Sequence, residues 1–363
     1  FGNVAVGRSS MVANTTGDNN VAVGQNSLVS NTTANNNTAV GTCSLASNTT
    51  GASNVALGHD ALKLNTTGAQ NTAVGMDALR DTTTGCRNTA MGYNSLVLNT
   101  TGICNVSIGR STLDANTTGD FNTAVGNSAL SSNTTADNNT AIGHLSLNAN
   151  TTGAENTAMG IQAMRYGTTG NYNTALGACT LGASDVNTGD SNIAIGRKSM
   201  FDNTSGAKNV GVGSSALENN TTAACNTAVG HVAMQQNTTG AQNTALGHCS
   251  LRNNTTASGN IAVGAFSLLT NSTGFSNVAV GTCQPSGYGA ALELNTTGDC
   301  NVAVGNGALR SNTTADNNTA LGTLAMGCNT TGTRNTAVGK LALQNNTTAT
   351  DQVAIGHEAL DAA

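Results

Sequence analysis

The sequence predicts an all-β protein, a parallel β-solenoid (β-roll) of about 21 coils with 17 residues per coil. A five-residue pattern, Asn-x-Ala-x-Gly, recurs along the whole chain, almost always at steps of 17. Such a period is too short for a repeat built from two helices. Glycine and β-branched residues at fixed positions also disfavour helix and favour short strands.

We number the positions of each coil as slots 1 to 17, with slot 1 at the Asn of the pattern. The consensus is Asn-(Thr/Val)-Ala-(Val/Ile/Leu/Met)-Gly-x-x-(Ala/Ser)-Leu-x-x-Asn-Thr-Thr-(Gly/Ala)-x-x. Two steps deviate: the coil 173–191 carries two extra residues, and a seven-residue loop insertion occupies 284–290. Residues 1–363 therefore read as a single solenoid repeat domain, which we expect to be a segment of a longer fibre.

Within each coil, we expect a strand at slots 2–4, a shorter one near slots 8 and 9, and a third extended piece near slots 12–14. Gly at slots 5 and 15 is expected to form corners, where a positive φ or tight packing excludes a side chain. Strands of successive coils would stack in parallel about 4.8 Å apart.

The aliphatic residues of slots 4 and 9 are the expected interior. Slot 3 lies on the opposite side of the strand from slot 4 and is Ala in 19 copies. Because a strand restricted on both faces is normally covered on both, we hypothesise a parallel homo-oligomer, most simply a trimer, with slot 3 near its axis. The alternative is a thin single-chain core that slot 3 faces, with slot 4 packing elsewhere. The candidate oligomer contacts are Ala73, Ala90, Ala124, Ala141, Ala228 and Ala245.

The segments NVAVG (3–7), NVALG (54–58) and NIAIG (192–196), each followed after two intervening residues by a small residue, resemble the S-V-A-I-G-x-x-S signature of trimeric autotransporter adhesin heads. They are also similar to repeats of phage tail fibres and other surface fibres. The resemblance covers all the copies through about half of the slots in each coil and does not include the Asn-Thr-Thr segment. It implies a left-handed parallel β-roll of three chains that binds host matrix or other cells.

The Asn of slot 12 opens an Asn-x-Ser/Thr sequence in 17 coils, which is the acceptor pattern for N-glycans. Three interpretations compete: a glycan stripe, a ladder of turns in which Asn bonds its own backbone, or a flat Asn-x-Thr array of the kind used by ice-binding proteins. The candidate N-glycosylation sites are Asn14, Asn31, Asn48, Asn65, Asn99, Asn116, Asn133, Asn150, Asn203, Asn220, Asn237, Asn254, Asn271, Asn295, Asn312, Asn329 and Asn346.

The nine cysteines are spread over several slots. Cys86 and Cys104 fall at adjacent slots of neighbouring coils and form a candidate disulfide. The five histidines share slot 6 and are expected to be solvated corner residues rather than metal ligands.

Composition excludes several classes of function. Only 9% of the residues are charged, the net charge is −5, and no basic block provides the footprint of nucleic-acid binding. No apolar run reaches the length of a membrane span. No nucleophile, base and acid occur together, so we expect no enzyme activity, no metal and no cofactor.

We therefore expect a structural or adhesive shaft of an extracellular or cell-surface fibre. Its partners would be further copies of the chain and a cell-surface glycan or matrix. The alternative is a solenoid binding protein, either a receptor-binding tail fibre or an ice-binding protein. A localised contact site, if present, is expected at the insertion 284–290 or near residues 182–189.

Overall fold

The computed structural model describes residues 1–182, 184, 186–283 and 289–361. It contains 21 strands of three residues each, and no helix occurs in these ranges. The chain forms two compact units, Phe1–Ala178 and Cys179–Ala363. The first unit holds β1 (Val4–Val6), β2 (Val21–Val23), β3 (Thr38–Val40), β4 (Val55–Leu57), β5 (Thr72–Val74), β6 (Thr89–Met91), β7 (Val106–Ile108), β8 (Thr123–Val125), β9 (Thr140–Ile142), β10 (Thr157–Met159) and β11 (Thr174–Leu176). The second holds β12 (Ile193–Ile195), β13 (Val210–Val212), β14 (Thr227–Val229), β15 (Thr244–Leu246), β16 (Ile261–Val263), β17 (Val278–Val280), β18 (Val302–Val304), β19 (Thr319–Leu321), β20 (Thr336–Val338) and β21 (Val353–Ile355).

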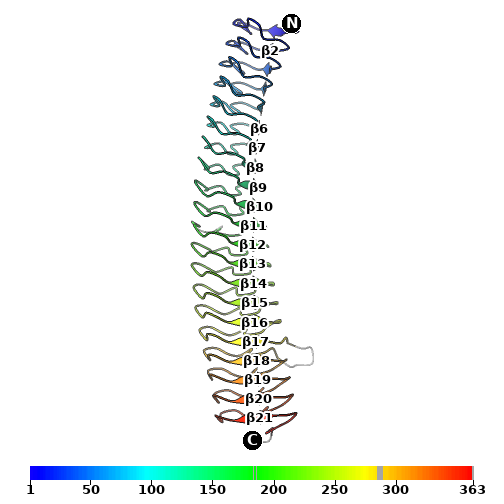
Figure 1. Ribbon diagram of the computed structural model, residues 1–363, viewed down its shortest axis with the longest axis vertical. Coiled ribbons are helices and arrows are strands. Elements are labelled where there is room, and N and C mark those ends of the chain that lie inside the picture. Colours follow the sequence, from blue (N-terminus) through cyan, green and yellow to red (C-terminus); the bar gives the residue numbers. More distant parts are fainter. Residues whose placement is uncertain (183, 185, 284–288, 362–363) are drawn as a thin grey trace. The chain divides into compact units, whose positions relative to one another are not determined.

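In each unit, every coil contributes one strand, and each strand pairs in parallel with the strand of the next coil (Figure 1). The register is maintained slot by slot, so that Ala73 lies beside Ala56 and Ala90. Between coils 277 and 301, where the sequence inserts seven residues, the register is still Ala279 beside Ala303. The predicted all-β parallel solenoid, with the same slot of successive coils in register, is therefore confirmed.

Only slots 2–4 form a strand. The segments near slots 8 and 9 and slots 12–14, which we expected to be extended, are turns and bends. Their backbones still bond from coil to coil, as when the N–H of Leu79 donates to Ser95 and that of Thr66 donates to Thr83. These contacts are isolated rungs rather than ladders of strand conformation, because the chain must turn several times to close each short coil.

The core of each coil is built from small residues. The Ala of slot 3 and the Leu or Met of slot 9 are fully buried nearly throughout, for example Ala73 and Leu79 at 0% exposure. The slot 4 side chains instead lie on the outside, half-buried or exposed. The prediction that slot 9 lies in the interior is thus confirmed, and the prediction that slot 4 does so is wrong. The structure has the alternative arrangement, a thin single-chain core that slot 3 faces. So short a coil encloses a space too narrow for a second large side chain beside the slot 9 Leu.

The corner at slot 5 requires glycine. These glycines have φ between 120° and 143° wherever φ is positive, a region that side chains avoid. In addition, a Cβ on Gly75 would lie 2.6 Å from the carbonyl oxygen of Gly92 in the next coil. The slot 15 corner differs, because Ala34 and Ala136 occupy it and are buried there. The predicted exclusion of side chains therefore applies strictly to slot 5.

Slots 7, 9 and 17 adopt the left-handed conformation in nearly every coil, although most of their residues are not glycine. In one coil these are Asp77 (φ 56°), Leu79 (φ 50°) and Arg87 (φ 60°). The left-handed conformation costs about 1–2 kcal/mol for a residue with a Cβ, and Asn bears it best. A β-branched residue there is the most strained, and Val232 at slot 7 has φ 51°.

We predict that Val232→Asn stabilises its coil by about 1 kcal/mol, because Asn accepts the left-handed backbone more readily than Val. Hydrogen–deuterium exchange, followed by mass spectrometry, should slow in peptides covering 226–259. The control is Val229→Asn in strand β14, where the backbone is extended. Exchange that is unchanged or faster in the Val232 variant would contradict this account of strain.

Candidate functional surfaces

The Asn side chains of slot 12 form a ladder inside each unit. Where the preceding coil also has an Asn-x-Ser/Thr sequence at slot 12, the side chain donates from Nδ2 to the carbonyl of slot 15 in its own coil and to the Oδ1 of that preceding Asn. Asn116 is typical: its Nδ2 lies 3.0 Å from the Gly119 oxygen and 2.9 Å from Asn99 Oδ1. The next rung repeats the pattern, with Asn133 Nδ2 3.0 Å from Asn116 Oδ1. The ladder satisfies polar groups that burial would otherwise make costly.

This ladder contradicts the candidate glycan stripe. An N-glycan is attached to Nδ2, and that atom here points into the coil and is engaged in hydrogen bonds. Sixteen of the seventeen candidate Asn residues are at most 3% exposed, and Asn14 in the first coil is half-buried. A sugar on these atoms would displace the ladder. The persistent Asn-x-Ser/Thr pattern is therefore explained by the turn ladder, which was the competing interpretation.

The flat Asn-x-Thr array is also contradicted, since its Asn column is buried. The Thr of slot 13 donates from Oγ1 to the slot 13 carbonyl of the next coil, as Thr66 does to Thr83 at 3.0 Å. The slot 14 Thr, such as Thr67, is exposed and forms a single column. The two-column array required for the ice-binding hypothesis is absent from the slots that we proposed for it.

A second Asn ladder, at slot 1, escaped the sequence reasoning. The Oδ1 of Asn54 accepts the backbone N–H of Asn71 at 2.9 Å, and Asn71 Nδ2 donates across its own coil to Gly85 at 2.8 Å. The sequence did contain a sign of this ladder, because slot 1 is Asn in every copy but the last, where Gln352 replaces it. A repeat-wide amide with no Asp or Ser replacement indicates that both its donor and its acceptor are used.

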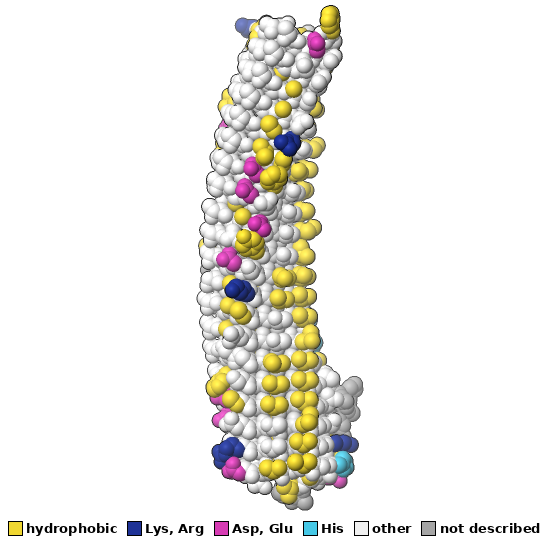
Figure 2. All heavy atoms as spheres, viewed as in Figure 1, with side chains coloured by type: hydrophobic (Ala, Val, Ile, Leu, Met, Phe, Trp, Pro, Cys, Tyr) yellow, Lys and Arg dark blue, Asp and Glu magenta, His cyan; other side chains and the backbone are white. Residues whose placement is uncertain are grey.

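The outer side of the strands forms an uncharged, largely aliphatic surface, which we call the strand face and define as slots 2 and 4 of every coil. Slot 2 is Thr, Val or Ile and slot 4 is Val, Ile, Leu or Met, with no charged residue in either slot of any coil. Many slot 4 side chains are well exposed, among them Leu57 (38%), Met91 (42%) and Leu246 (47%). Figure 2 shows hydrophobic side chains in columns along the strands β12–β21.

The candidate oligomer contacts at slot 3 lie inside the coil, on the opposite side of the strands from the strand face. All six are 0% exposed inside a single chain and are therefore unavailable to a second one. The error arose from taking the larger aliphatic residue as the interior one. The six residues are Ala73, Ala90, Ala124, Ala141, Ala228 and Ala245.

Cys86 and Cys104 lie in neighbouring coils, and the Cys104 N–H donates to the Cys86 carbonyl at 3.0 Å. Both are nevertheless free thiols. The Cys86 Sγ is directed to backbone groups of Thr84 and Ala69. The candidate disulfide is thus not formed in this structure.

The histidines of slot 6 produce one local cluster. The rings of His231 and His248 stack 5.4 Å apart, and Phe266 contacts His248 edge-on at 5.1 Å. The Cys249 Sγ lies 3.5 Å from His248 Nε2. Over the described ranges, no three His, Cys, Asp or Glu side chains come together in a way that could hold a metal ion.

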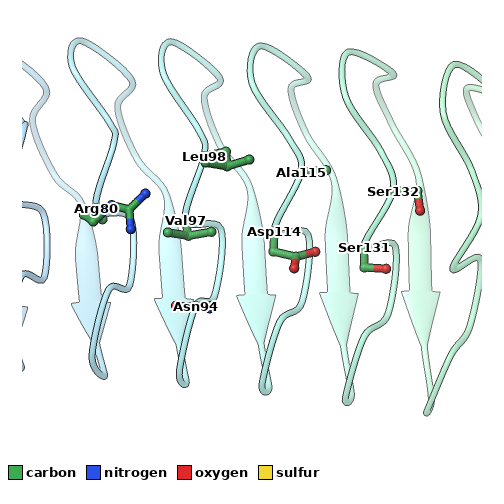
Figure 3. Close-up of a pocket in the computed structure, with 8 residues that line it drawn as sticks. All are labelled: Arg80, Asn94, Val97, Leu98, Asp114, Ala115, Ser131 and Ser132. Atoms are coloured by element: carbon green, nitrogen blue, oxygen red, sulfur yellow. The ribbon is translucent and has the colours of Figure 1, made fainter.

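The first unit has a shallow hollow of about 590 Å³ where the slot 10 and slot 11 side chains of successive coils meet (Figure 3). We call it the slot 10 hollow. Leu98, Ala115 and Ser132 line it from slot 11. Its other lining residues are Asn94 from slot 7 and, from slot 10, Arg80, Val97, Asp114 and Ser131.

The two charged residues of the hollow differ in their partners. Arg80 is paired, with Nε 2.7 Å from an Asp81 oxygen and a second contact of 3.9 Å to Asp77. The Asp114 carboxylate is half-buried, and its own backbone N–H and that of Ala115 are the groups nearby that favour its charged form. Burial raises the pKa of Asp114 above its ordinary value, and these backbone N–H groups only partly oppose the increase. No ion pair among the described residues includes Asp114.

The two insertions are only partly described. Residues 284–288 of the loop insertion lie outside the described residues, as do 183 and 185 of the shorter one, so a contact site there remains a prediction. The end of the long insertion is part of the core, because Ala290 is fully buried.

Comparison with known proteins found no match to a protein-family model and none to a curated protein. In the part of the chain that the structure describes, no helix is long and apolar enough to cross a bilayer.

We predict that Thr82→Asn stabilises the first unit. Thr82 interrupts the slot 12 ladder, leaving Asn65 Oδ1 without a partner and Asn99 Nδ2 with a long 3.5 Å contact to the Thr82 hydroxyl. An Asn there would supply both bonds and remove a buried unsatisfied acceptor, which costs about 1–3 kcal/mol. The midpoint of thermal unfolding should rise, whereas the exposed neighbour Thr84→Asn should leave it unchanged. An equal response from both variants would argue against the ladder.

We also predict that folded protein, secreted from a eukaryotic host, carries no glycan at the sixteen buried slot 12 positions. The reason is that attachment at Nδ2 removes a ladder donor and needs space the coil lacks. Peptide mapping before and after enzymatic deglycosylation measures this. A glycan on Asn116 in material with native hydrogen exchange would refute the buried ladder.

Proposed function

We propose that the chain is a structural shaft element that assembles with further copies of itself through the strand face. The observation that carries this proposal is the uncharged, outward-facing strand face, whose slot 4 column is Val, Ile, Leu or Met in every coil of each unit. Large exposed apolar surfaces mark interaction sites, since leaving them in water is unfavourable. The hypothesis of self-association is therefore kept, with its contact moved from slot 3 to slots 2 and 4.

The size of the strand face of the first unit alone reaches the lower bound of a specific interface. With a coil spacing of about 4.8 Å and a strand of three residues at about 3.3 Å each, the strands β1–β11 present about 500 Å². Two such faces together bury about 1,000 Å², which is where specific protein–protein interfaces begin. Association through this face removes the aliphatic slot 4 side chains from water, and it requires no charged group to be desolvated.

A second copy of this chain is the partner that the strand face fits best. Its rows of side chains repeat at the coil spacing, so a partner that packs along many coils must have the same period. Another copy has that period and a face of the same composition. The resemblance to trimeric surface fibres supports the same assembly and an extracellular or cell-surface location for it.

Sedimentation velocity tests the proposal, and we expect the wild-type chain to sediment as a dimer, trimer or larger assembly. Ile108→Lys combined with Ile142→Lys places two charges on the strand face and should yield monomers. The fold tolerates them because slot 4 faces outward. The control is Ser30→Lys with Ser47→Lys at slot 11, which should assemble like the wild type. Wild-type protein that remains monomeric at micromolar concentration would refute the proposal.

A further inference from the structure

Among the described residues, the Asp114 carboxylate in the slot 10 hollow has no cation paired with it, unlike the carboxylates of two other residues at slot 10. Glu218 and Glu293 also occupy slot 10, and each has a cation close by: Lys198 Nζ lies 3.4 Å from Glu218 and Arg310 Nε lies 3.5 Å from Glu293. Burial raises the pKa of Glu218, but hydrogen bonds from Gln235, Ser215 and Lys198 bring it below its ordinary value. At Asp114 the coil provides the carboxylate and no cation.

The repeat shows where the missing cation would be. Lys198 occupies slot 7 of the coil before Glu218, twenty residues earlier in the sequence. The residue twenty before Asp114 is Asn94, whose short neutral side chain lines the hollow. In the second unit the Lys198 side chain reaches Glu218 from this slot, whereas the shorter Asn94 lines the hollow and carries no ammonium group.

The rest of the lining restricts what could enter. Ser131 and Ser132 bring hydroxyl groups to the side of Asp114 away from Arg80 (Figure 3). Val97 and Leu98 present apolar surface on the other side, between Arg80 and Asp114. Arg80 is held by Asp77 and Asp81, so it does not neutralise Asp114. The surroundings favour a cation that also has hydroxyl groups and an apolar side.

We propose that the slot 10 hollow binds an amino sugar, with the primary ammonium group on Asp114, hydroxyl groups on Ser131 and Ser132, and the apolar face of the ring on Val97 and Leu98. The ammonium group takes the place that a slot 7 lysine occupies relative to Glu218. Bound this way, the sugar supplies the charge partner that the chain itself does not provide. The site lies on the coil surface formed by slots 10 and 11, apart from the strand face, so assembly through the strand face leaves it open.

The test uses glucosamine as the probe and N-acetylglucosamine as the matched ligand without the ammonium charge. Saturation-transfer NMR and a titration at pH 7 measure binding to the full chain. We expect glucosamine to bind with a Kd of about 1 mM, as befits a dozen-atom ligand in an open hollow, and N-acetylglucosamine to bind at least tenfold more weakly. Methylamine, which has the charge but no ring or hydroxyl groups, should also bind at least tenfold more weakly.

Two variants locate the site. Asn94→Lys should pair internally with Asp114 and weaken glucosamine binding at least tenfold, without disturbing the backbone that Lys198 also adopts at slot 7. The control is Asn26→Lys, at slot 7 of a coil where the residue twenty positions later is Ala46; binding should be unchanged. Asp114→Asn removes the charge and should abolish binding.

Three outcomes would overturn the proposal. These are no measurable binding of glucosamine to the wild type, equal binding to the Asn94→Lys and Asn26→Lys variants, or equal binding of glucosamine and N-acetylglucosamine. Methylamine that binds as tightly as glucosamine would reduce the hollow to a simple ammonium site and refute the role assigned to the serines and the apolar side chains.

Discussion

The narrow interior of each short coil is the constraint on which the rest of the structure depends. After one Leu or Met at slot 9 has been placed, only small side chains fit beside it, which is why slot 3 is Ala and slot 8 is mostly Ala or Ser. The remaining interior is occupied by the two Asn side chains of slots 1 and 12. These amides bond to neighbouring coils as well as their own, so the polar part of the core also holds the stack together. A single coil has little to stabilise it alone, and nearest-neighbour stacking supplies the stability.

The sequence was sufficient for the architecture. The repeat period, the glycine corner and the in-register stack could all be predicted, because a register shift would place unlike slots together and the repeat forbids it. The faces of the strand could not be assigned correctly. Alternation shows only that slots 2 and 4 share one side, and the usual association of large aliphatic residues with the interior then favoured the wrong side. The restriction of slot 3 to small residues, with Ala in 19 copies, was the better guide, since an exposed position would have accepted Lys or Glu.

The prediction of glycan sites at the slot 12 Asn was wrong for a related reason, because the local sequence does not show whether a side chain is buried. Asn116 has the same local sequence as an acceptor site, and nothing in three residues distinguishes an exposed amide from a buried one. The distinction comes from the stack, where the Asn of the previous coil accepts the Nδ2 hydrogen bond. The slot 10 hollow was beyond sequence reasoning as well, because it depends on the coil-to-coil proximity of Asn94 and Asp114. Once the slot register is known, however, the comparison of this pair with Lys198 and Glu218 can be made from the sequence alone.

The assignment of inner and outer slots is the central claim, and methionine oxidation tests it directly. Met164 and Met200 occupy slot 9 and are at most 1% exposed, whereas Met91 and Met159 occupy slot 4 and are each 42% exposed. Peroxide converts accessible methionine to the sulfoxide, and mass spectrometry locates the change. In the monomeric strand-face lysine variant, the account predicts rapid oxidation of Met91 and Met159 and protection of Met164 and Met200. Protection of Met91 and Met159 with oxidation of Met164 and Met200 would contradict it.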